Sequence, residues 1–153
     1  MPDAIIMLNQ QLWVGTGTAS ADRNLSNRLL SCQWTEKFDD HDVTVMGSTT
    51  RIRAIGLGES DIKAEFMHNY STSDAGENLD QLFENLKSVS QAGGKFLVRI
   101  RPFSGNRGAT NPEYSMACVM AERTIFDGAV GDPLKNPITF LSADSVVRAT
   151  VTS

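Results

Sequence analysis

The chain reads Ile62-Lys63-Ala64-Glu65-Phe66 near its middle, where apolar and charged side chains alternate strictly. Successive side chains of a β-strand point to opposite faces, so this pattern predicts a strand with one buried and one solvated face. The same period recurs at Phe96-Leu97-Val98-Arg99-Ile100-Arg101 and over residues 28–37. Between Tyr114 and Phe126 both alternating faces are apolar. That pattern predicts a strand that is central in its sheet or covered on both sides.

A single helix is expected between two of these strands. Its apolar stripe recurs at the helical period and consists of Leu79, Leu82, Phe83, Leu86 and Val89. Asn78 suits the N-cap and Gly93-Gly94 suits the stop, so the helix is predicted over about residues 78–91. With so little helix the sheet must be mainly antiparallel, because parallel strands need long crossovers. We therefore expect a mainly β fold, an antiparallel β-sandwich or partly open barrel with one flanking helix and long loops.

The segment between residues 38 and 58 is expected to be irregular. The sequence predicts an acidic turn at Phe38-Asp39-Asp40-His41-Asp42 and a short strand at Val43–Met46. A further strand over residues 50–55 is expected to end in a turn at Gly56-Leu57-Gly58. The acidic run surrounds a histidine, but it lacks the glycine and the terminal glutamate of an EF-hand. A solvated turn is therefore favoured over a cation site.

The 153 residues suffice for one domain with its own core. We take residues 1–153 as a single domain in which residues 1–27 form an N-terminal strand and an extended arm. A net charge of −4 argues against a protein that grips nucleic acid, since such affinity comes mainly from lysine and arginine. No apolar run approaches the roughly 20 residues of a membrane helix, and no signal peptide is expected. Cys32 and Cys118 are expected to be free thiols.

Residue patterns for catalysis are scarce. The sequence contains neither a GxSxG nucleophile elbow nor a GxxxxGK[ST] phosphate loop. Asp80 and Glu84 share a face of the predicted helix, but its apolar stripe must face the core, so both acids are expected to be solvated. We therefore expect a protein that is not an enzyme and that uses neither a cofactor nor a metal.

Four arginines could gather on one sheet face. They are Arg51, Arg53, Arg99 and Arg101. A basic ridge would form if their strands paired, but nucleic-acid binding also needs aromatic stacking platforms, which these strands lack. We favour the alternative in which Arg99 and Arg101 pair across strands with Glu65 or Glu122.

Several motifs occur in a particular order along the chain. The first group comprises Asp42-Val43-Thr44-Val45-Met46-Gly47-Ser48, Arg51 and Ile55-Gly56-Leu57-Gly58, leading into the strand at Ile62. The second comprises Val98-Arg99-Ile100-Arg101-Pro102, Thr110-Asn111-Pro112-Glu113-Tyr114, Gly128-Ala129-Val130-Gly131-Asp132 and Pro137-Ile138-Thr139-Phe140. Each motif alone is weak. In order and spacing together, roughly residues 28–152 resemble the tail tube (major tail) proteins of long-tailed bacteriophages.

This resemblance implies a structural virion protein that self-assembles into hexameric rings, which stack into the tail tube through which the genome is delivered. It implies the terminator, tape measure and distal tail proteins as partners, and DNA that passes without specific binding. The location implied is the virion tail, after assembly in the host bacterial cytoplasm. It also implies an assembly loop, roughly Trp34 to Arg53, that reaches a neighbouring subunit or ring. The candidate assembly residues are Trp34, Phe38, Asp39, Asp40, His41, Asp42, Met46, Arg51 and Arg53.

Two other functions stay open at this point. One is a tube protein of a contractile tail or a secretion system. The other is a monomeric or trimeric β-sandwich module that binds a ligand or decorates a capsid. An aromatic content of only 7% makes a concave aromatic binding site harder to build, which disfavours the second function.

Overall fold

The structure, a computed structural model, describes residues 10–15, 23–67, 79–103, 105–125 and 127–150. Its elements in chain order are β1 (Gln11–Val14), β2 (Arg23–Asn24), the 3-10 helix η1 (Ser26–Arg28), β3 (Leu29–Asp42), β4 (Arg53–Met67), α1 (Leu79–Gln91), β5 (Phe96–Arg101), β6 (Glu113–Arg123), β7 (Lys135–Ser142) and β8 (Val147–Ala149). Most of the expected N-terminal arm and the expected N-cap Asn78 lie outside the described residues.

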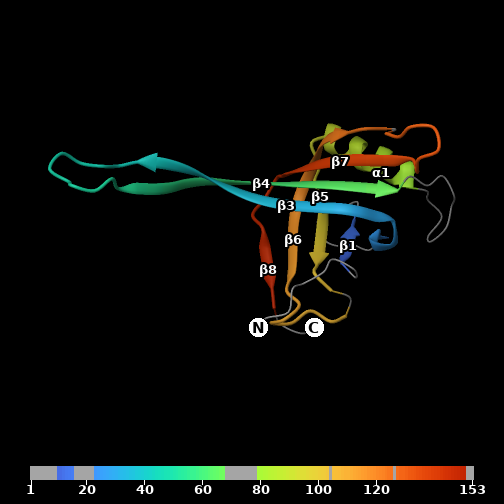
Figure 1. Cartoon of the computed structure of the whole chain (residues 1–153), viewed down its shortest axis with the longest axis horizontal. Coiled ribbons are helices and arrows are strands. Elements are labelled where there is room, and N and C mark those ends of the chain that lie inside the picture. Colours follow the sequence, from blue (N-terminus) through green and yellow to red (C-terminus); the bar gives the residue numbers. More distant parts are fainter. Residues whose placement is uncertain (1–9, 16–22, 68–78, 104, 126, 151–153) are drawn as a thin grey trace.

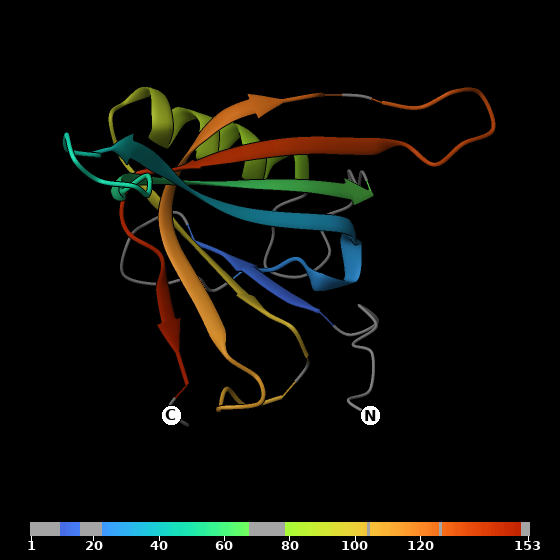
Figure 2. The same ribbon diagram turned by 60° about the vertical axis from the view of Figure 1, so that its left-hand side comes forward.

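The strands form one antiparallel sheet in the order β2-β1-β5-β6-β7-β4-β3, and β8 pairs with β6. This confirms the expected mainly β fold with one helix, in the form of an open sheet. β6 is central, as its apolar faces predicted, because β5 pairs with one of its edges while β7 and β8 share the other. The sheet curls about β6, and α1 lies beside it (Figures 1 and 2).

The alternating residues of the strands form the core, as predicted. Phe66 of β4 packs against Phe83 of α1 with the ring centroids 5.4 Å apart. Phe96 of β5 meets Phe140 of β7 edge to face at 5.1 Å. All four rings are fully buried, so each contributes most of the roughly 1.5–3 kcal/mol available from burying a large apolar side chain.

Helix α1 runs over Leu79–Gln91, close to the predicted range. Its buried residues are Leu79, Leu82, Phe83 and Leu86. The helix ends where Gly94 N donates to the Val89 carbonyl at 2.9 Å and Gly93 adopts a φ of 81°, which glycine tolerates without strain. No helix among the described residues has the length and apolar character needed to cross a membrane.

Asp80 and Glu84 remain accessible to solvent, as expected, with side chains 31% and 46% exposed, but they share a partner that the sequence did not predict. Both carboxylates pair with the guanidinium group of Arg123, whose side chain is only 6% exposed and lies over the Phe83 ring. The Arg123–Glu84 distance is 2.6 Å. Arg123 comes from the end of β6, nearly 40 residues later, so local spacing on the helix could not reveal it.

The prediction that Arg99 and Arg101 pair with Glu65 or Glu122 was wrong. Arg101 Nε donates to Glu113 Oε2 at 2.7 Å, and Arg99 lies 3.6 Å from the same carboxylate. The Glu113 side chain is only 4% exposed. Arg101 also stacks on the Trp13 ring at 4.6 Å. The register of β5 against β6 places Glu113 beside these arginines, and no ridge with the arginines of the β3–β4 hairpin forms.

Candidate assembly surface

β3 and β4 are the longest strands, and their hairpin extends well beyond the rest of the sheet (Figure 1). Only Asp61–Met67 of β4 pairs with β7, and the last link is a hydrogen bond from Ser60 N to Ser142 Oγ at 3.1 Å. Beyond that point the two strands pair with each other and with no other strand of the described residues. We call residues 37–59 the arm and residues 43–52, which connect its two strands, the tip.

The structure corrects the irregular path expected for residues 38–58. Phe38–Asp42 is strand rather than an acidic turn, Val43–Met46 lies in the tip rather than in a strand, and Gly56–Gly58 continues β4. Charged residues suggested a turn, but a ribbon exposed on both faces accepts charges at every position. The assembly segment predicted from the resemblance is thus a β-hairpin.

Gly56 and Gly58, the two glycines of β4 in the arm, make room for side chains of β3. A Cβ added at Gly56 would lie 2.6 Å from His41 Nε2, and one added at Gly58 would lie 3.1 Å from the Phe38 ring. The pairing register shifts between the pairs Phe38–Gly58 and Asp40–Ile55, because β4 has one more residue than β3 between them. Such a β-bulge bends and twists the ribbon. The glycines therefore mark cross-strand packing and a bulge, where the sequence suggested a turn.

The tip is held by specific hydrogen bonds. Val43 N donates to the Ile52 carbonyl at 2.9 Å, and Ile52 N donates to Thr44 Oγ1 at 2.8 Å. Thr44 in turn donates from its hydroxyl and its backbone N–H to Asp42 Oδ1. These two donors lower the pKa of Asp42 below its ordinary value and so favour the carboxylate. Gly47, with a φ of 95°, turns the chain at the apex.

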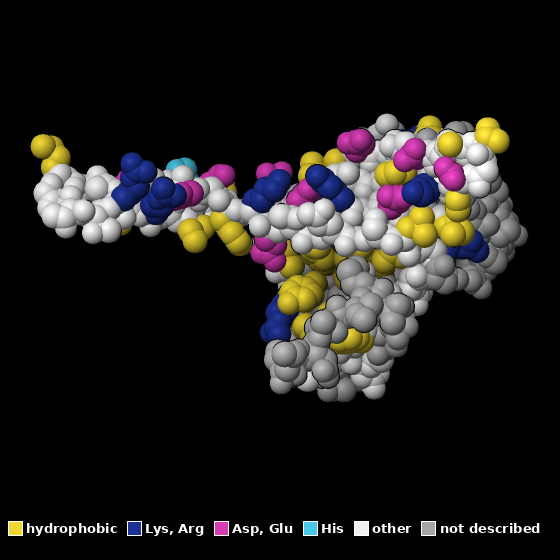
Figure 3. Space-filling model, viewed as in Figure 1, with side chains coloured by type: hydrophobic (Ala, Val, Ile, Leu, Met, Phe, Trp, Pro, Cys, Tyr) yellow, Lys and Arg dark blue, Asp and Glu magenta, His cyan; other side chains and the backbone are white. Residues whose placement is uncertain are grey.

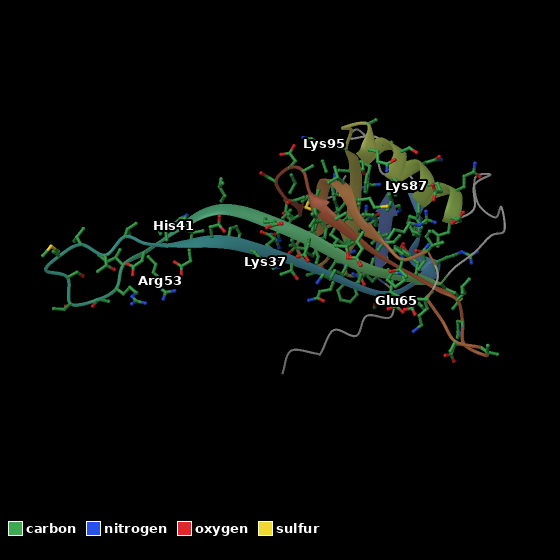
Figure 4. All side chains as sticks on the ribbon, turned by 90° about the horizontal axis from the view of Figure 1, so that it is seen from above. Lys37, His41, Arg53, Glu65, Lys87 and Lys95 are labelled. Carbon is green, nitrogen blue, oxygen red and sulfur yellow. The ribbon has the colours of Figure 1, made fainter. Side chains whose placement is uncertain are left out.

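The charged candidates divide between the two faces of the arm. Asp40 pairs with Arg53, and Asp42 Oδ2 lies 3.3 Å from Arg51 Nε, so these four residues form one ionic row. His41 is paired in register with Ala54 on the opposite face. Figure 4 shows His41 and Arg53 far along the arm, with Lys37 nearer the body. Exposed pairs of this kind add little stability but keep the ribbon soluble.

Apolar side chains are unusually exposed on the arm. Among the described residues, those of the arm are Phe38, Val43, Val45, Met46, Ile52, Ile55 and Leu57. They make up more than half of the exposed large apolar side chains of the described residues, and Met46 at the apex is fully exposed. Figure 3 shows apolar side chains along one border of the arm and at its end. Exposed apolar patches of this kind mark contacts with other proteins.

Sequence reasoning named Phe38 and Met46 of this apolar set and missed Ile55 and Leu57. The available signal was that Ile55 and Leu57 alternate with Gly56 and Gly58 at the period of a strand. This pattern was missed because the glycines were interpreted as a turn.

Trp34 lies at the base of the arm, apart from the other candidates. Its half-buried ring meets Tyr114 of β6 edge to face, with centroids 6.2 Å apart. Both residues line a hollow of about 320 Å³, together with Cys32, Glu36, Ile100 and Pro102. The structure thus brings together the arm candidates and places Trp34 with a separate apolar hollow.

The described residues show no arrangement suited to catalysis. No group of three or more histidine, cysteine, aspartate or glutamate side chains in that part of the chain could hold a metal ion. The acids of Asp39–Asp42 alternate between the two faces of a strand, so they do not converge on one point. Cys32 and Cys118 are free thiols, and burial raises the pKa of Cys32 to about 12. A thiol that stays protonated is a poor nucleophile.

No family model matches the chain, and neither does the sequence of any curated protein. Solved structures do match its fold. The SPP1 tail tube superposes with a TM-score of 0.70 over 98% of this chain and 81% of that one, at 12% identity. The tail of an empty gene transfer agent particle, refined with C6 symmetry, gives 0.64 over 91% and 96%, at 12% identity.

A third match comes from a contractile system. The sheath–tube complex of an extracellular contractile injection system gives a TM-score of 0.61 over 97% of this chain and 93% of that one, at 14% identity. These matches cover nearly the whole chain, and all come from tails or tubes. The chain therefore has the tail-tube fold, as the resemblance of its motifs predicted.

Proposed function

We propose that this chain is a structural subunit of a phage tail tube, which self-assembles into hexameric rings that stack around a central channel. The observation that carries this proposal is the arm. A long hairpin projects from a tail-tube fold and exposes apolar side chains that the subunit itself does not cover. A catalytic role has no support in the residue patterns or in the matched structures.

Unpaired strand edges give the assembly its mechanism. β3 is the last strand of its sheet, so one edge along its 14 residues pairs with no other described strand. β4 has a second unpaired edge beyond Ser60. Edges of this length invite pairing with another chain, and closure into a ring removes them. The C6 symmetry of the matched gene transfer agent tail supports six subunits per ring.

The charge of the chain suits a conduit for DNA. Duplex DNA carries one negative charge per roughly 1.7 Å of its axis, so a basic wall would hold it tightly. The net charge of −4 and the acids of the arm instead favour a wall over which the genome slides without specific binding. A continuous lysine and arginine lining in the assembled tube would contradict this part of the proposal.

The family resemblance extends the proposal to location and partners. The subunit would assemble in the host bacterial cytoplasm and become part of the virion tail. Terminator, tape measure and distal tail proteins would contact the tube at its ends and in its channel.

A tube inside a contractile sheath is the second candidate, because the sheath–tube complex of an injection system matches the same fold. The two candidates differ in what the outer surface of the tube binds. A sheath protein encoded beside this chain that co-sediments with the assembled tube would favour the contractile system.

Negative-stain microscopy of the purified protein tests the proposal, with analytical ultracentrifugation beside it. The matched control replaces the tip with Asn-Gly between Asp42 and Arg53, which are direct cross-strand partners and suit a two-residue turn. We expect stacked six-fold rings from the wild-type protein, and folded but unstacked particles from the control. Uniform small particles of wild-type protein at high concentration would contradict the proposal and favour a binding or decoration module.

A further inference from the structure

The hollow at the base of the arm is shaped for an apolar side chain. Its walls are mainly apolar or aromatic and come from three strands, through Cys32 and Trp34 of β3, Ile100 of β5 and Tyr114 of β6, while Gln10 and Glu36 add polar groups. Its volume of about 320 Å³ lies at the small end of protein binding pockets, which suits one or two side chains better than a large ligand. Figure 3 shows apolar side chains gathered where the arm leaves the body.

The tip of the arm complements this hollow. Met46 at its apex is fully exposed, and its unbranched thioether chain adapts to irregular apolar cavities. The tip contains one base, Arg51, and no acid, whereas Glu36 at the hollow is an exposed acid with no ion pair among the described residues. Arg51 contacts Asp42 through Nε, which leaves its two Nη groups for a second acid. Shape and charge therefore point to the same pairing.

The tip cannot reach the hollow of its own subunit. Trp34 and Asp42 lie on one continuous strand, which separates them by about 26 Å at roughly 3.3 Å per residue. The arm also points away from the body (Figure 1). The partner must therefore be a second copy of the chain.

We propose that the tip of each arm inserts Met46 into the hollow beside Trp34 of a subunit in the next ring, with Arg51 facing that subunit's Glu36. This inference rests on the proposed tube function and names the contact that joins the rings. The contact is heterologous, so it repeats without closing and extends a stack. The arm then sets the ring-to-ring repeat at about 26–40 Å, from the strand length with the tip added.

Site-specific photocrosslinking tests this contact in the assembled tube. The variant Met46→p-benzoylphenylalanine places a photoreactive group at the apex, where the subunit's own fold imposes no constraint. Irradiation of its tubes should link the tip to peptides that contain Cys32–Glu36, Ile100 or Tyr114 of another copy. The matched control carries the same group at Val130, which is equally exposed in the turn between β6 and β7. The control should give no link to those peptides.

A charge exchange provides a second measurement that does not depend on photochemistry. Glu36→Arg and Arg51→Glu should each raise the critical concentration for stacking, by about five-fold. The double variant restores the opposite charges and should return it to within about two-fold of the wild type. Both side chains are exposed, so circular dichroism should show folded subunits in every case.

The outcomes separate this inference from the proposed function. Tubes whose tip links elsewhere, for example to residues 125–134, or links to nothing, would overturn the contact and leave the tube function standing. Additive losses in the double variant would likewise overturn it. Failure of the wild-type protein to form tubes would overturn the proposed function itself.

Discussion

Phe38→Ala separates the stability of the subunit from the stability of the assembly. Phe38 is 56% exposed, and its ring lies over Gly58 on the neighbouring strand. Full burial of a phenylalanine contributes about 1.5–3 kcal/mol, so the part already buried contributes about 1 kcal/mol to the isolated subunit. Phe140→Ala removes a fully buried ring and should cost about 3–5 kcal/mol.

The exposed part of Phe38 becomes important only on assembly. If a neighbouring subunit covers the remaining surface, that burial adds about 1–1.5 kcal/mol per subunit. Because 1.4 kcal/mol corresponds to a factor of ten in an equilibrium constant, the critical concentration should rise about five- to twelve-fold in Phe38→Ala. The monomer should lose little.

The assay combines sedimentation with chemical denaturation. Pelleting of tubes over a range of protein concentrations gives the critical concentration, and urea unfolding below that concentration gives the subunit stability. Val147→Ala is the matched control, because Val147 is 57% exposed but lies on β8, away from the arm. An unchanged critical concentration for Phe38→Ala, or an equal rise for Val147→Ala, would refute the role assigned to the arm.

Two further predictions concern the body. Glu113→Gln removes the charge from a carboxylate that is 4% exposed and pairs with several arginines. Urea denaturation should show that the free energy of unfolding falls by about 3–5 kcal/mol. A fall of less than about 1 kcal/mol would contradict the structural role of this cluster. The pKa of Glu84 is lowered from 4.5, first by its hydrogen bond with Lys87 and then by Arg123. The contribution of Glu84 to the stability of the folded subunit is therefore present above that pH and is lost as the pH falls through the folded-state pKa. The melting temperature below pH 4.5 should therefore depend less on pH in Glu84→Gln than in the wild type. Parallel plots of melting temperature against pH for the two proteins would contradict this role of Glu84.

The strands of the body could be predicted because each has one buried face. Ile62, Ala64 and Phe66 point to the core while their neighbours remain accessible, so burial imposes the period of two on the sequence. The helix was predictable for the same reason, since its stripe faces the sheet. Contacts between distant elements were not predictable. The pairing of Arg101 with Glu113 depends on the register of β5 against β6, which no local pattern encodes.

The strands of the arm could not be predicted in this way. Its strands have no buried face in the subunit, so acids, a histidine and glycines occupy positions that resemble a turn. The family resemblance placed the assembly segment at about Trp34–Arg53, which overlaps β3 and the tip but omits most of β4. The contribution of each candidate residue to assembly stays a prediction, and the single-residue variants test it at Phe38, Met46 and Arg51.

An isolated two-stranded ribbon is marginally stable in water, and this explains why the arm contains so many local contacts. The Thr44 hydrogen bonds and the ring of Phe38 over Gly58 stabilise the hairpin without a third strand, whereas the exposed Asp40–Arg53 pair adds little. Alternating charges also oppose indiscriminate pairing of its free edges. The exposed apolar side chains are therefore already positioned to bind a complementary surface. A flexible loop with the same apolar residues would lose more entropy on docking, so a preformed hairpin is the better device for joining identical subunits.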